Sequence, residues 1–532
     1  MAHQGAQAPD SSSSSSSSIA AADSGETYEA AVRDLNGLQT NYQILEQIRA
    51  SGGRLNEYSI PEFEAFLEKM GHAVGDLDKL NVIHVAGTKG KGSTCAFVAS
   101  ILSQLPTTTT SGSGGGRLKV GLFTSPHLIE VRERIQINGA PISRALFAQY
   151  FYETYNALRS PTPALRRVAK ESPDMPMYFR FLTLMAFHAF LREHVDVAVV
   201  EVGVGGEYDS TNAVRRPVVC GITSLGLDHQ ITLGSTIQQI AWHKAGIIKH
   251  AVPVYTVAGQ DPAALGVIRE RAAERSAPLR VAGPDAELSG CPVQLGIAGA
   301  HQRTNAALAA ALCREWVART AASLVVGTLS SSGEDAVDAA VVAGLRCASW
   351  PGRSQTFASP RCGPRLTWHV DGAHTVESMA ACARWFAQTQ QQPSAAGSAR
   401  RVLLFNAAHA RNASQLLATL VESGGSSGGG FCEAVFCPNV SRRSDSTNVT
   451  VFTDPDLGPQ KEAAAAWSRL AAEMASAGSA ATTVLPSIDD AVAYIESKYC
   501  GAANDAVPPT HVLATGSLHL VGGVLDVAKG SI

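Results

Sequence analysis

Residues 87–94 read Gly-Thr-Lys-Gly-Lys-Gly-Ser-Thr, a set of residue types that can bind a phosphate group. Backbone N–H groups of a glycine-rich turn and of a helix start bind phosphate, a lysine adds positive charge, and a hydroxyl can bind Mg²⁺. The common pattern places the hydroxyl residue directly after the lysine. Here Gly92 separates Lys91 from Ser93 and Thr94. We therefore expect a phosphate site of a different form, and a flexible Gly-Lys turn is the alternative interpretation.

Acidic and imidazole side chains follow two apolar runs farther along the chain. Glu201 ends one run and is followed by glycines, and Asp228 with His229 follows the next run. Because open α/β sheets bind ligands at the carboxyl ends of their strands, a metal held against the phosphates is expected there. A surface charge at Glu201 and a structural hydrogen bond at His229 are the alternatives. Lys244 lies on an expected helix and, taken alone, would be an ordinary solvated lysine.

Short, β-branched apolar runs alternate with stretches of helical spacing, which indicates an α/β fold with parallel sheets covered on both faces. The expected helices include residues 93–102, 181–191 and 487–494, the last with a Ser-x-x-Asp start typical of a helix cap. A helical lead is expected at 28–80. The expected strands fall into two sets, which predict two α/β domains joined near 340–350. The first set is 81–87, 118–125, 195–203, 218–225 and 252–257, and the second set is 365–374, 401–408, 433–440, 482–487 and 510–517.

Composition limits the partners of this protein. The 532 residues carry a net charge of -3, which gives no general attraction to nucleic acid or to an anionic membrane. No apolar run approaches the roughly 20 residues needed to span a bilayer. The ten cysteines include no C-x-x-C pair, so we expect reduced, mostly buried thiols in an intracellular protein.

Several segments are too polar or too simple to form a core. Residues 1–27 are rich in serine and alanine, without the features of a secretory signal or an arginine-rich leader, so a disordered N-terminus and a cytoplasmic location are expected. The stretches 107–116, 388–400 and 423–430 are rich in Gly, Ser, Thr or Gln and are expected to be solvated surface connections.

Taken together, the motifs resemble those of the folylpolyglutamate synthases, members of the Mur ligase superfamily, from about residue 28 to residue 525. Lys89 favours the eukaryotic type, since bifunctional bacterial enzymes and dihydrofolate synthases commonly carry asparagine there. The motifs that carry the resemblance, besides residues 87–94, are TSPHLIEVRERIQINGAPIS (124–143), EVGVGGEYDSTN (201–212), SLGLDH (224–229), AWHKAGIIK (241–249), HQRTNAALA (301–309), WPGR (350–353), DGAHT (371–375) and ATGSLHLVGGVL (514–525).

The resemblance implies an architecture and an activity. A P-loop ATPase-type parallel-sheet domain would occupy residues 28–345 and also bind folate, and a smaller Rossmann-like α/β domain would occupy 346–532. ATP would phosphorylate the γ-carboxylate of a reduced folate, and the amine of L-glutamate would attack the acyl phosphate. The implied cofactors are ATP, two Mg²⁺ ions, a monovalent cation such as K⁺ and a CO₂-derived carbamate on Lys244. A monomer is expected, and a mitochondrial form is possible. Dihydrofolate synthase and a non-catalytic nucleotide-binding relative are the alternatives.

The resemblance also assigns roles to individual residues. Ser93 rather than Thr94 is expected to bind metal. The family's acidic residue before Arg411 is replaced by Ala410, which puts glutamate affinity or choice of amino acid in doubt. The assigned residues are Lys91, Lys244 and His374 for catalysis; Gly87, Thr88, Lys89, Gly90, Lys91, Gly92, Ser93, Asn305, Arg353 and Asp371 for ATP; Ser125 and His127 for folate; and Ser93, Glu201 and His229 for metal.

Overall fold

The computed structural model describes residues 26–39, 57–107, 116–159, 163–169, 172–288, 293–324, 333–389, 399–407, 412–424, 430–441, 454–473, 481–500 and 508–530. Residues 1–25, for which disorder was expected, lie outside the described residues, as do Ala410, Arg411 and most of the three Gly/Ser-rich stretches. At the ends of the first stretch, β2 (Pro106–Thr107) pairs antiparallel with β3 (Gly116–Arg117).

The first sheet has the strand order β10-β9-β8-β1-β7-β4-β5-β6. The first five expected runs form its parallel centre, so this prediction is confirmed. The sequence did not predict the two edges of this sheet. The short strands β5 and β6 add an antiparallel edge, and β10 lies at the other edge. The strands are β1 (Ile83–Ala86), β4 (Val120–Phe123), β5 (Ile135–Ile137), β6 (Ala140–Pro141), β7 (Val197–Glu201), β8 (Val219–Ile222), β9 (Val254–Val257) and β10 (Leu279–Ala282).

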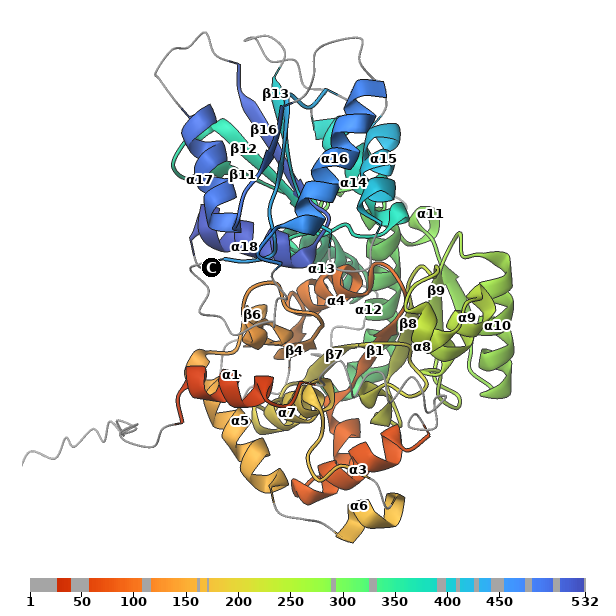
Figure 1. The fold of residues 1–532 in the computed structure, drawn as a ribbon. Coiled ribbons are helices and arrows are strands. Elements are labelled where there is room, and N and C mark those ends of the chain that lie inside the picture. The colour runs from red at the N-terminus through yellow and green to blue at the C-terminus, as the bar shows by residue number, and fades with distance from the viewer. Residues whose placement is uncertain are drawn as a thin grey trace, which may run out of the picture.

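Helices cover both faces of this sheet (Figure 1). In β7, Val197 and Val199 pack toward α4 and α12, whereas Ala198 and Val200 pack toward α5 and α7. Burial on both faces explains why these strands read as continuous apolar runs. The helices of this part are α1 (Tyr28–Asn36), α3 (Ser59–Lys69), η1 (Val74–Leu80), α4 (Lys91–Leu102), η2 (Val131–Arg134), α5 (Arg144–Leu158), α6 (Pro163–Val168), α7 (Tyr178–Arg192), η3 (Ser210–Ala213), α8 (Gln230–Leu233), α9 (Ile237–Ala245), α10 (Pro262–Glu274), α11 (Pro284–Glu287), α12 (Gln302–Leu324) and α13 (Gly333–Cys347).

The second sheet has the order β11-β12-β16-β13-β14-β15 and is parallel except for β11, which is antiparallel to β12. Two helical layers enclose it (Figure 1). Ser487 caps α17 by accepting the Asp490 N–H, as its Ser-x-x-Asp start predicts. The elements are β11 (Gln355–Ser359), β12 (Gly363–Asp371), α14 (Val376–Thr389), β13 (Arg400–Phe405), α15 (Ala413–Ser423), β14 (Glu433–Phe436), α16 (Gly458–Glu473), β15 (Ala481–Val484), α17 (Ile488–Tyr499), β16 (Thr510–Thr515) and α18 (Leu518–Lys529).

The α/β class and its two-sheet arrangement are thus as expected. The last helix of the first part, α13, ends at Cys347, and the first strand of the second sheet begins at Gln355. A domain boundary at 345/346 stays a prediction. Within the described part of the chain, no helix is both long and apolar enough to cross a membrane.

The expectation that all cysteines are reduced is wrong for one pair. Cys362 and Cys500 form a disulfide, with their Cα atoms 5.2 Å apart. Cys362 lies in the turn between β11 and β12, and Cys500 follows α17, which packs on β12. Tertiary packing brings the two together across a sequence separation of 138, which no spacing rule reveals. Among the described free cysteines, Cys347 and Cys432 are exposed, and the buried ones are Cys95, Cys220, Cys313, Cys382 and Cys437.

The two parts of the molecule contact each other through the loop after β4. Leu128 and Ile129 pack against the hydrophobic core formed by α17 and α18. A Cβ added at Gly522 would lie 2.1 Å from the Leu128 carbonyl oxygen, so α18 needs glycine at this contact. The segment 124–128, expected to contact folate, is therefore also part of the interface between the domains.

Candidate functional site

The segment 87–94 forms the expected strand–turn–helix arrangement between β1 and α4. Gly90 caps α4 with a φ of 89°, a conformation that side chains disfavour. A Cβ there would also lie 2.2 Å from Oδ1 of Asn305, and a Cβ at Gly87 would lie 1.8 Å from Oγ1 of Thr223. Both glycines are therefore required by close approach of neighbouring side chains. That the N-terminus of α4 binds a phosphate stays a prediction.

Lys91 and Glu201 form the central charged pair of the site. Lys91 is the first residue of α4 and Glu201 is the last residue of β7, and β7 pairs with β1 so that Glu201 lies opposite Val85. The Lys91 Nζ atom lies 4.0 Å from Glu201 Oε1, and both side chains are largely buried. The Ser125 N–H donates to Glu201 Oε2 at 3.0 Å. Burial raises the pKa of Glu201, and the positive charge of Lys91 opposes that rise.

The hydroxyl groups of α4 connect to a distant motif. Ser93 Oγ accepts from Gln302 Nε2 at 3.3 Å, and Gln302 Oε1 accepts from Asn305 Nδ2 at 2.9 Å. The structure thus brings Asn305 of the HQRTN motif to the phosphate loop. Thr94 Oγ1 is buried without a hydrogen-bond partner. The choice of Ser93 over Thr94 as a metal ligand stays a prediction.

Lys244 lies in the last turn of α9 and is only 2% exposed. Its Nζ donates to the carbonyl oxygen of Gly87 at 2.8 Å. Burial lowers the pKa of Lys244 to about 7, and the nearby positive charge of Lys91 contributes to this. A substantial fraction of this side chain is therefore the neutral, nucleophilic amine near pH 7. This differs sharply from the solvated lysine of the alternative interpretation.

Asp228 and His229 lie beside the phosphate loop after β8. Lys89 Nζ is 3.0 Å from Asp228 Oδ2, and the His229 N–H donates to Asp228 Oδ1 at 2.9 Å. Burial tends to raise the pKa of Asp228, but Lys89 outweighs it and the pKa falls to about 2. Burial lowers the pKa of His229, which favours the neutral imidazole that a metal requires. His229 caps the short helix α8 with a φ of 50°.

Metal binding by protein groups alone is not supported. Among the described residues, no three His, Cys, Asp or Glu side chains gather closely enough to hold an ion. Mg²⁺ commonly binds through one or two protein oxygens and the oxygens of its substrate.

The second domain contributes the WPGR and DGAHT motifs to the same region. A Cβ at Gly92 would lie 3.2 Å from Nε1 of Trp350, so the WPGR segment lies against the start of α4. Asp371, the last residue of β12, accepts from the N–H and the hydroxyl of Ser354 at 2.7 and 3.2 Å. Burial lowers the pKa of Arg353, while the charges of Asp371 and Glu201 raise it. Arg353 thus lies within electrostatic reach of acids from both domains.

His374 follows the end of β12 and is held by local hydrogen bonds. Its Nδ1 lies 2.7 Å from the carbonyl oxygen of Gly372, and its backbone N–H donates to Ser378 Oγ at 3.1 Å. Because a carbonyl oxygen can only accept, Nδ1 carries a proton, which leaves Nε2 as the nitrogen that can gain or lose one. This tautomer suits a proton acceptor.

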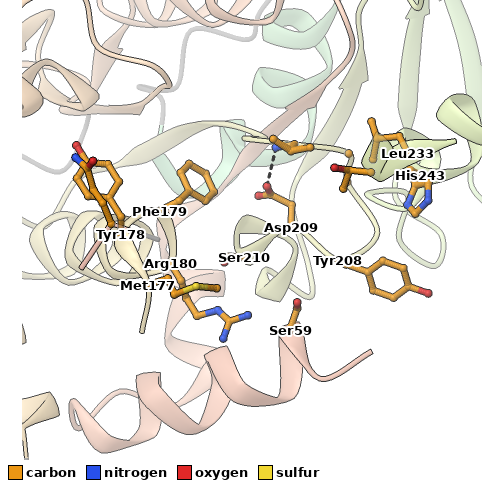
Figure 2. Close-up of a pocket in the computed structure, with 15 residues that line it drawn as sticks. Ser59, Met177, Tyr178, Phe179, Arg180, Tyr208, Asp209, Ser210, Leu233 and His243 are labelled. Atoms are coloured by element: carbon orange, nitrogen blue, oxygen red, sulfur yellow. Dashed lines mark hydrogen bonds between the residues drawn. The ribbon is translucent and has the colours of Figure 1, made fainter. Parts of the chain in front are cut away.

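Sequence reasoning did not identify the cavity between α3, the start of α7 and the loop after β7. It has a volume of about 500 Å³, and its walls include Phe179, Arg180, Tyr208, Asp209 and His243 (Figure 2). Neither residue expected to contact folate lines it. The signal was nonetheless present, since the resemblance rested partly on EVGVGGEYDSTN, which contains two of these residues.

Asp209 is the buried carboxylate of this cavity. Its Oδ1 accepts from the N–H and the hydroxyl of Thr211 at 3.0 and 2.6 Å, and its Oδ2 accepts from the Val204 N–H at 3.0 Å. Burial raises the pKa of Asp209, whereas these hydrogen bonds and the charge of Lys91 lower it. The cavity is therefore electrostatically connected to the phosphate loop.

His127 lies outside the cavity, near the contact between the domains. Its Nδ1 accepts from Arg134 Nε at 2.9 Å, and its buried Nε2 has no hydrogen-bond partner. Burial and the charge of Arg134 hold the pKa of His127 well below its usual value, so the ring is neutral. The folate-binding role of Ser125 and His127 stays a prediction.

Comparison with known proteins identifies the family. No protein-family profile matches the chain. A folylpolyglutamate synthase of Bos taurus is 40% identical over 95% of this chain and 93% of its own length. One of Neurospora crassa is 39% identical over 96% and 92%, and a probable one of Schizosaccharomyces pombe is 40% identical over 95% of each chain. The chain belongs to the folylpolyglutamate synthase family. The Bos taurus protein is named as mitochondrial, and the location of this family member stays a prediction.

Solved structures agree with this family assignment. A Mycobacterium tuberculosis folylpolyglutamate synthase complexed with ADP and AMPPCP is 25% identical, with a TM-score of 0.65 over 88% of this chain and 95% of its own. The Thermotoga maritima folylpolyglutamate synthase is also 25% identical, with a TM-score of 0.60 over 89% and 94%. The two-sheet Mur ligase architecture of this folylpolyglutamate synthase family member is thus as expected.

Proposed function

We propose that this chain lengthens the glutamate tail of reduced folates by γ-linked amide bonds, through an acyl phosphate. Its family membership makes it an ATP-dependent, ADP-forming ligase of folate and glutamate. The linkage, the intermediate and the residue roles are the proposal. The observation that carries it is the buried pair Lys91–Glu201, 4.0 Å apart, at the N-terminus of α4. This pair supplies a cation for the phosphates and an acid for a metal at one point.

Phosphoryl transfer needs positioning and charge neutralisation rather than covalent chemistry by the protein. Lys91 and the N-terminus of α4 would bind the β- and γ-phosphates of ATP. Arg353, within electrostatic reach of Asp371 and Glu201, would balance charge from the other domain. Asn305 would contact the adenine side of the nucleotide. These groups align the γ-phosphate with a folate γ-carboxylate, a poor electrophile until it gains a phosphate leaving group.

The oxygen donors fit Mg²⁺. Ser93 and Glu201 would hold a first ion, and His229 would hold a second together with a modified Lys244. When bound, Mg²⁺ neutralises the charge that develops on the transferred phosphoryl group. A monovalent cation such as K⁺ remains an expectation of the family, and the described residues suggest no site for it.

Carbamylation of Lys244 fits its environment. The neutral amine attacks the carbon of CO₂ and its nitrogen releases a proton, so an anionic carbamate replaces an ammonium. The reaction needs an unprotonated amine, and a pKa of about 7 supports it. The exchange of charge would also remove the repulsion between Lys244 and Lys91.

The cavity of about 500 Å³ would bind the pteroyl group of the acceptor. Such a volume is in the range of small-ligand sites, which are mostly apolar with a few placed polar groups. Phe179 and Tyr208 offer aromatic contacts, and Asp209 offers a buried acceptor for ring N–H groups (Figure 2). His374 would accept a proton from the glutamate ammonium, because only the free amine attacks the acyl phosphate.

The test is substrate-dependent ADP release. Purified protein is given ATP, Mg²⁺, tetrahydrofolate and L-glutamate, and each is left out in turn. We expect ADP only when all are present, with a product that is longer by glutamate residues in a mass spectrum. ADP release at the same rate with and without L-glutamate would refute the proposal. Turnover with dihydropteroate in place of tetrahydrofolate would instead favour dihydrofolate synthase. We also expect a cytoplasmic monomer that binds only small-molecule substrates.

A further inference from the structure

A set of hydrogen bonds joins the phosphate loop to the β8–α8 loop, residues 223–229. The backbone N–H groups of Thr88 and Lys89 donate to the Ser224 carbonyl oxygen at 3.0 and 3.1 Å. Thr88 Oγ1 then lies 3.2 Å from both the N and the O atom of Gly226. The first half of the β8–α8 loop is therefore fixed to the phosphate loop by backbone N–H groups and by the Thr88 hydroxyl.

The second half of this loop is joined to the phosphate loop through side chains. Lys89 Nζ lies 3.0 Å from Asp228 Oδ2, and Asp228 Oδ1 accepts from the backbone N–H of His229 at 2.9 Å. One carboxylate thus links an ammonium of the phosphate loop to the backbone of His229. Among the described residues of the β8–α8 loop, Asp228 makes the one hydrogen bond to the phosphate loop beyond Gly226.

The backbone of His229 needs support. Its φ of 50° and ψ of 37° are in the left-handed region, which a non-glycine residue keeps only where its surroundings enforce it. After His229, the helix α8 is anchored by Leu233, which is 3% exposed. Asp228 on one side and Leu233 on the other therefore hold the backbone of His229 in place.

The two lysines of the phosphate loop have different partners. Lys91 faces Glu201 at 4.0 Å, whereas Lys89 contacts Asp228 at 3.0 Å. A lysine whose ammonium is already held by a carboxylate is poorly placed to serve as the phosphate ligand. The expected grouping of Lys89 with the ATP-binding residues therefore needs a different physical explanation.

We infer that Lys89 is a positioning residue: through Asp228 it holds the backbone of His229 against the phosphate loop. The consequence for metal binding rests on the proposed function, in which His229 is a ligand of the second Mg²⁺. The loop contact itself does not depend on that role. Partners that orient a metal ligand commonly change metal affinity by about 10–100-fold when removed.

Amide hydrogen exchange of the metal-free, full-length protein tests the loop contact. The variants are Lys89→Met, Asp228→Asn and their combination, and Lys79→Met is the control, since Lys79 forms an exposed ion pair with Asp76 elsewhere. We expect faster exchange in peptides that cover 225–233 for both single variants, with no further increase in the combination. Unchanged exchange in Lys89→Met would overturn the inference, as would fully additive effects.

A Mg²⁺ titration in the presence of AMPPCP tests the consequence, with the thermal shift as readout. Both single variants should need about 10–100-fold more Mg²⁺ for half of the shift. The AMPPCP affinity of Asp228→Asn without Mg²⁺ should not fall below that of the wild type, because this change removes a negative charge near the phosphate loop. Weaker metal-free AMPPCP binding in Lys89→Met but not in Asp228→Asn would make Lys89 a phosphate ligand and refute the inference. If His229→Ala leaves the Mg²⁺ dependence unchanged, the proposed role of His229 fails, and the exchange data still decide the loop contact.

Discussion

The Nζ atom of Lys244 lies 2.8 Å from the carbonyl oxygen of Gly87, which precedes it by 157 positions. The contact fixes the end of α9 to the start of the phosphate loop. It also holds a buried amine within the electrostatic influence of Lys91, whose positive charge helps to lower the pKa of Lys244.

Replacing Lys244 with methionine should abolish turnover and change the pH dependence of stability. The pKa of Lys244 is about 7 in the folded protein and about 10.4 in an unfolded chain. Between these values the unfolded chain binds more protons, so this group makes stability rise with pH. We expect the melting temperature of Lys244→Met to rise less between pH 7 and 10 than that of the wild type. Identical slopes in thermal melts would contradict the pKa shift.

Gly90→Ala should disable the phosphate loop. The new Cβ meets Asn305 Oδ1 at 2.2 Å and also needs a φ of 89°. The backbone strain alone costs about 1–2 kcal/mol. Gly71→Ala is the matched control, because Gly71 has a φ of 81° and no atom near its Cβ. Thermal unfolding and AMPPCP binding should show a larger loss for Gly90→Ala, and Asn305→Ala in the same chain should partly restore the thermal stability. Equal losses at both glycines would exclude the clash.

Glu201→Gln and Lys91→Met should each lower turnover by at least about 100-fold, as expected for groups that stabilise transition-state charge. Because the two side chains are neighbours, the double variant should be little worse than either single one. ADP release measures this, and circular dichroism checks the fold. Lys79→Met serves as the exposed control. If the losses of the two single variants multiply in the double variant, Lys91 and Glu201 act separately.

Buried His84 should make the protein sensitive to acid. Its Nε2 lies 2.9 Å from Thr211 Oγ1, and burial lowers its pKa to about 3, assisted by Lys249. In the unfolded chain a histidine has a pKa near 6.5. As the pH falls from about 6.5 to about 3, the unfolded chain takes up a proton at His84 that the folded protein does not, so the free energy of unfolding falls by up to about 1.4 kcal/mol per pH unit.

His84→Asn should flatten that part of the stability curve, measured by urea unfolding at several values between about pH 4 and about pH 7. The exposed His194 provides the control variant, His194→Asn. An unchanged slope in His84→Asn would show that other groups cause the acid sensitivity.

Much of the fold follows from local patterns. Strands such as β1 and β7 were predictable because burial on both faces requires continuous apolar residues. The edge strand β10 was missed because its middle residues, Arg280 and Val281, are exposed and show no such run. The order of strands in each sheet depends on tertiary packing, and the sequence pattern does not encode it locally.

In the site, too, some residues could be predicted from the sequence and others could not. Lys91 and Glu201 could be predicted because each begins or ends a helix or strand that the sequence pattern reveals. The ion pair between Lys89 and Asp228 could not be predicted from the sequence, because it forms only where β1 and β8 are neighbours in the sheet. The cavity around Asp209 is likewise formed by segments that meet only in the folded chain.

The contact between Leu128 and Gly522 has a mechanical consequence for catalysis. Only Pro126 and His127 separate Leu128, which packs on α18, from Ser125, whose N–H binds Glu201. The same short segment therefore joins the packing of α18 to the hydrogen bond that orients this carboxylate, so a substitution that displaces α18 should also disturb the acid at the phosphate loop.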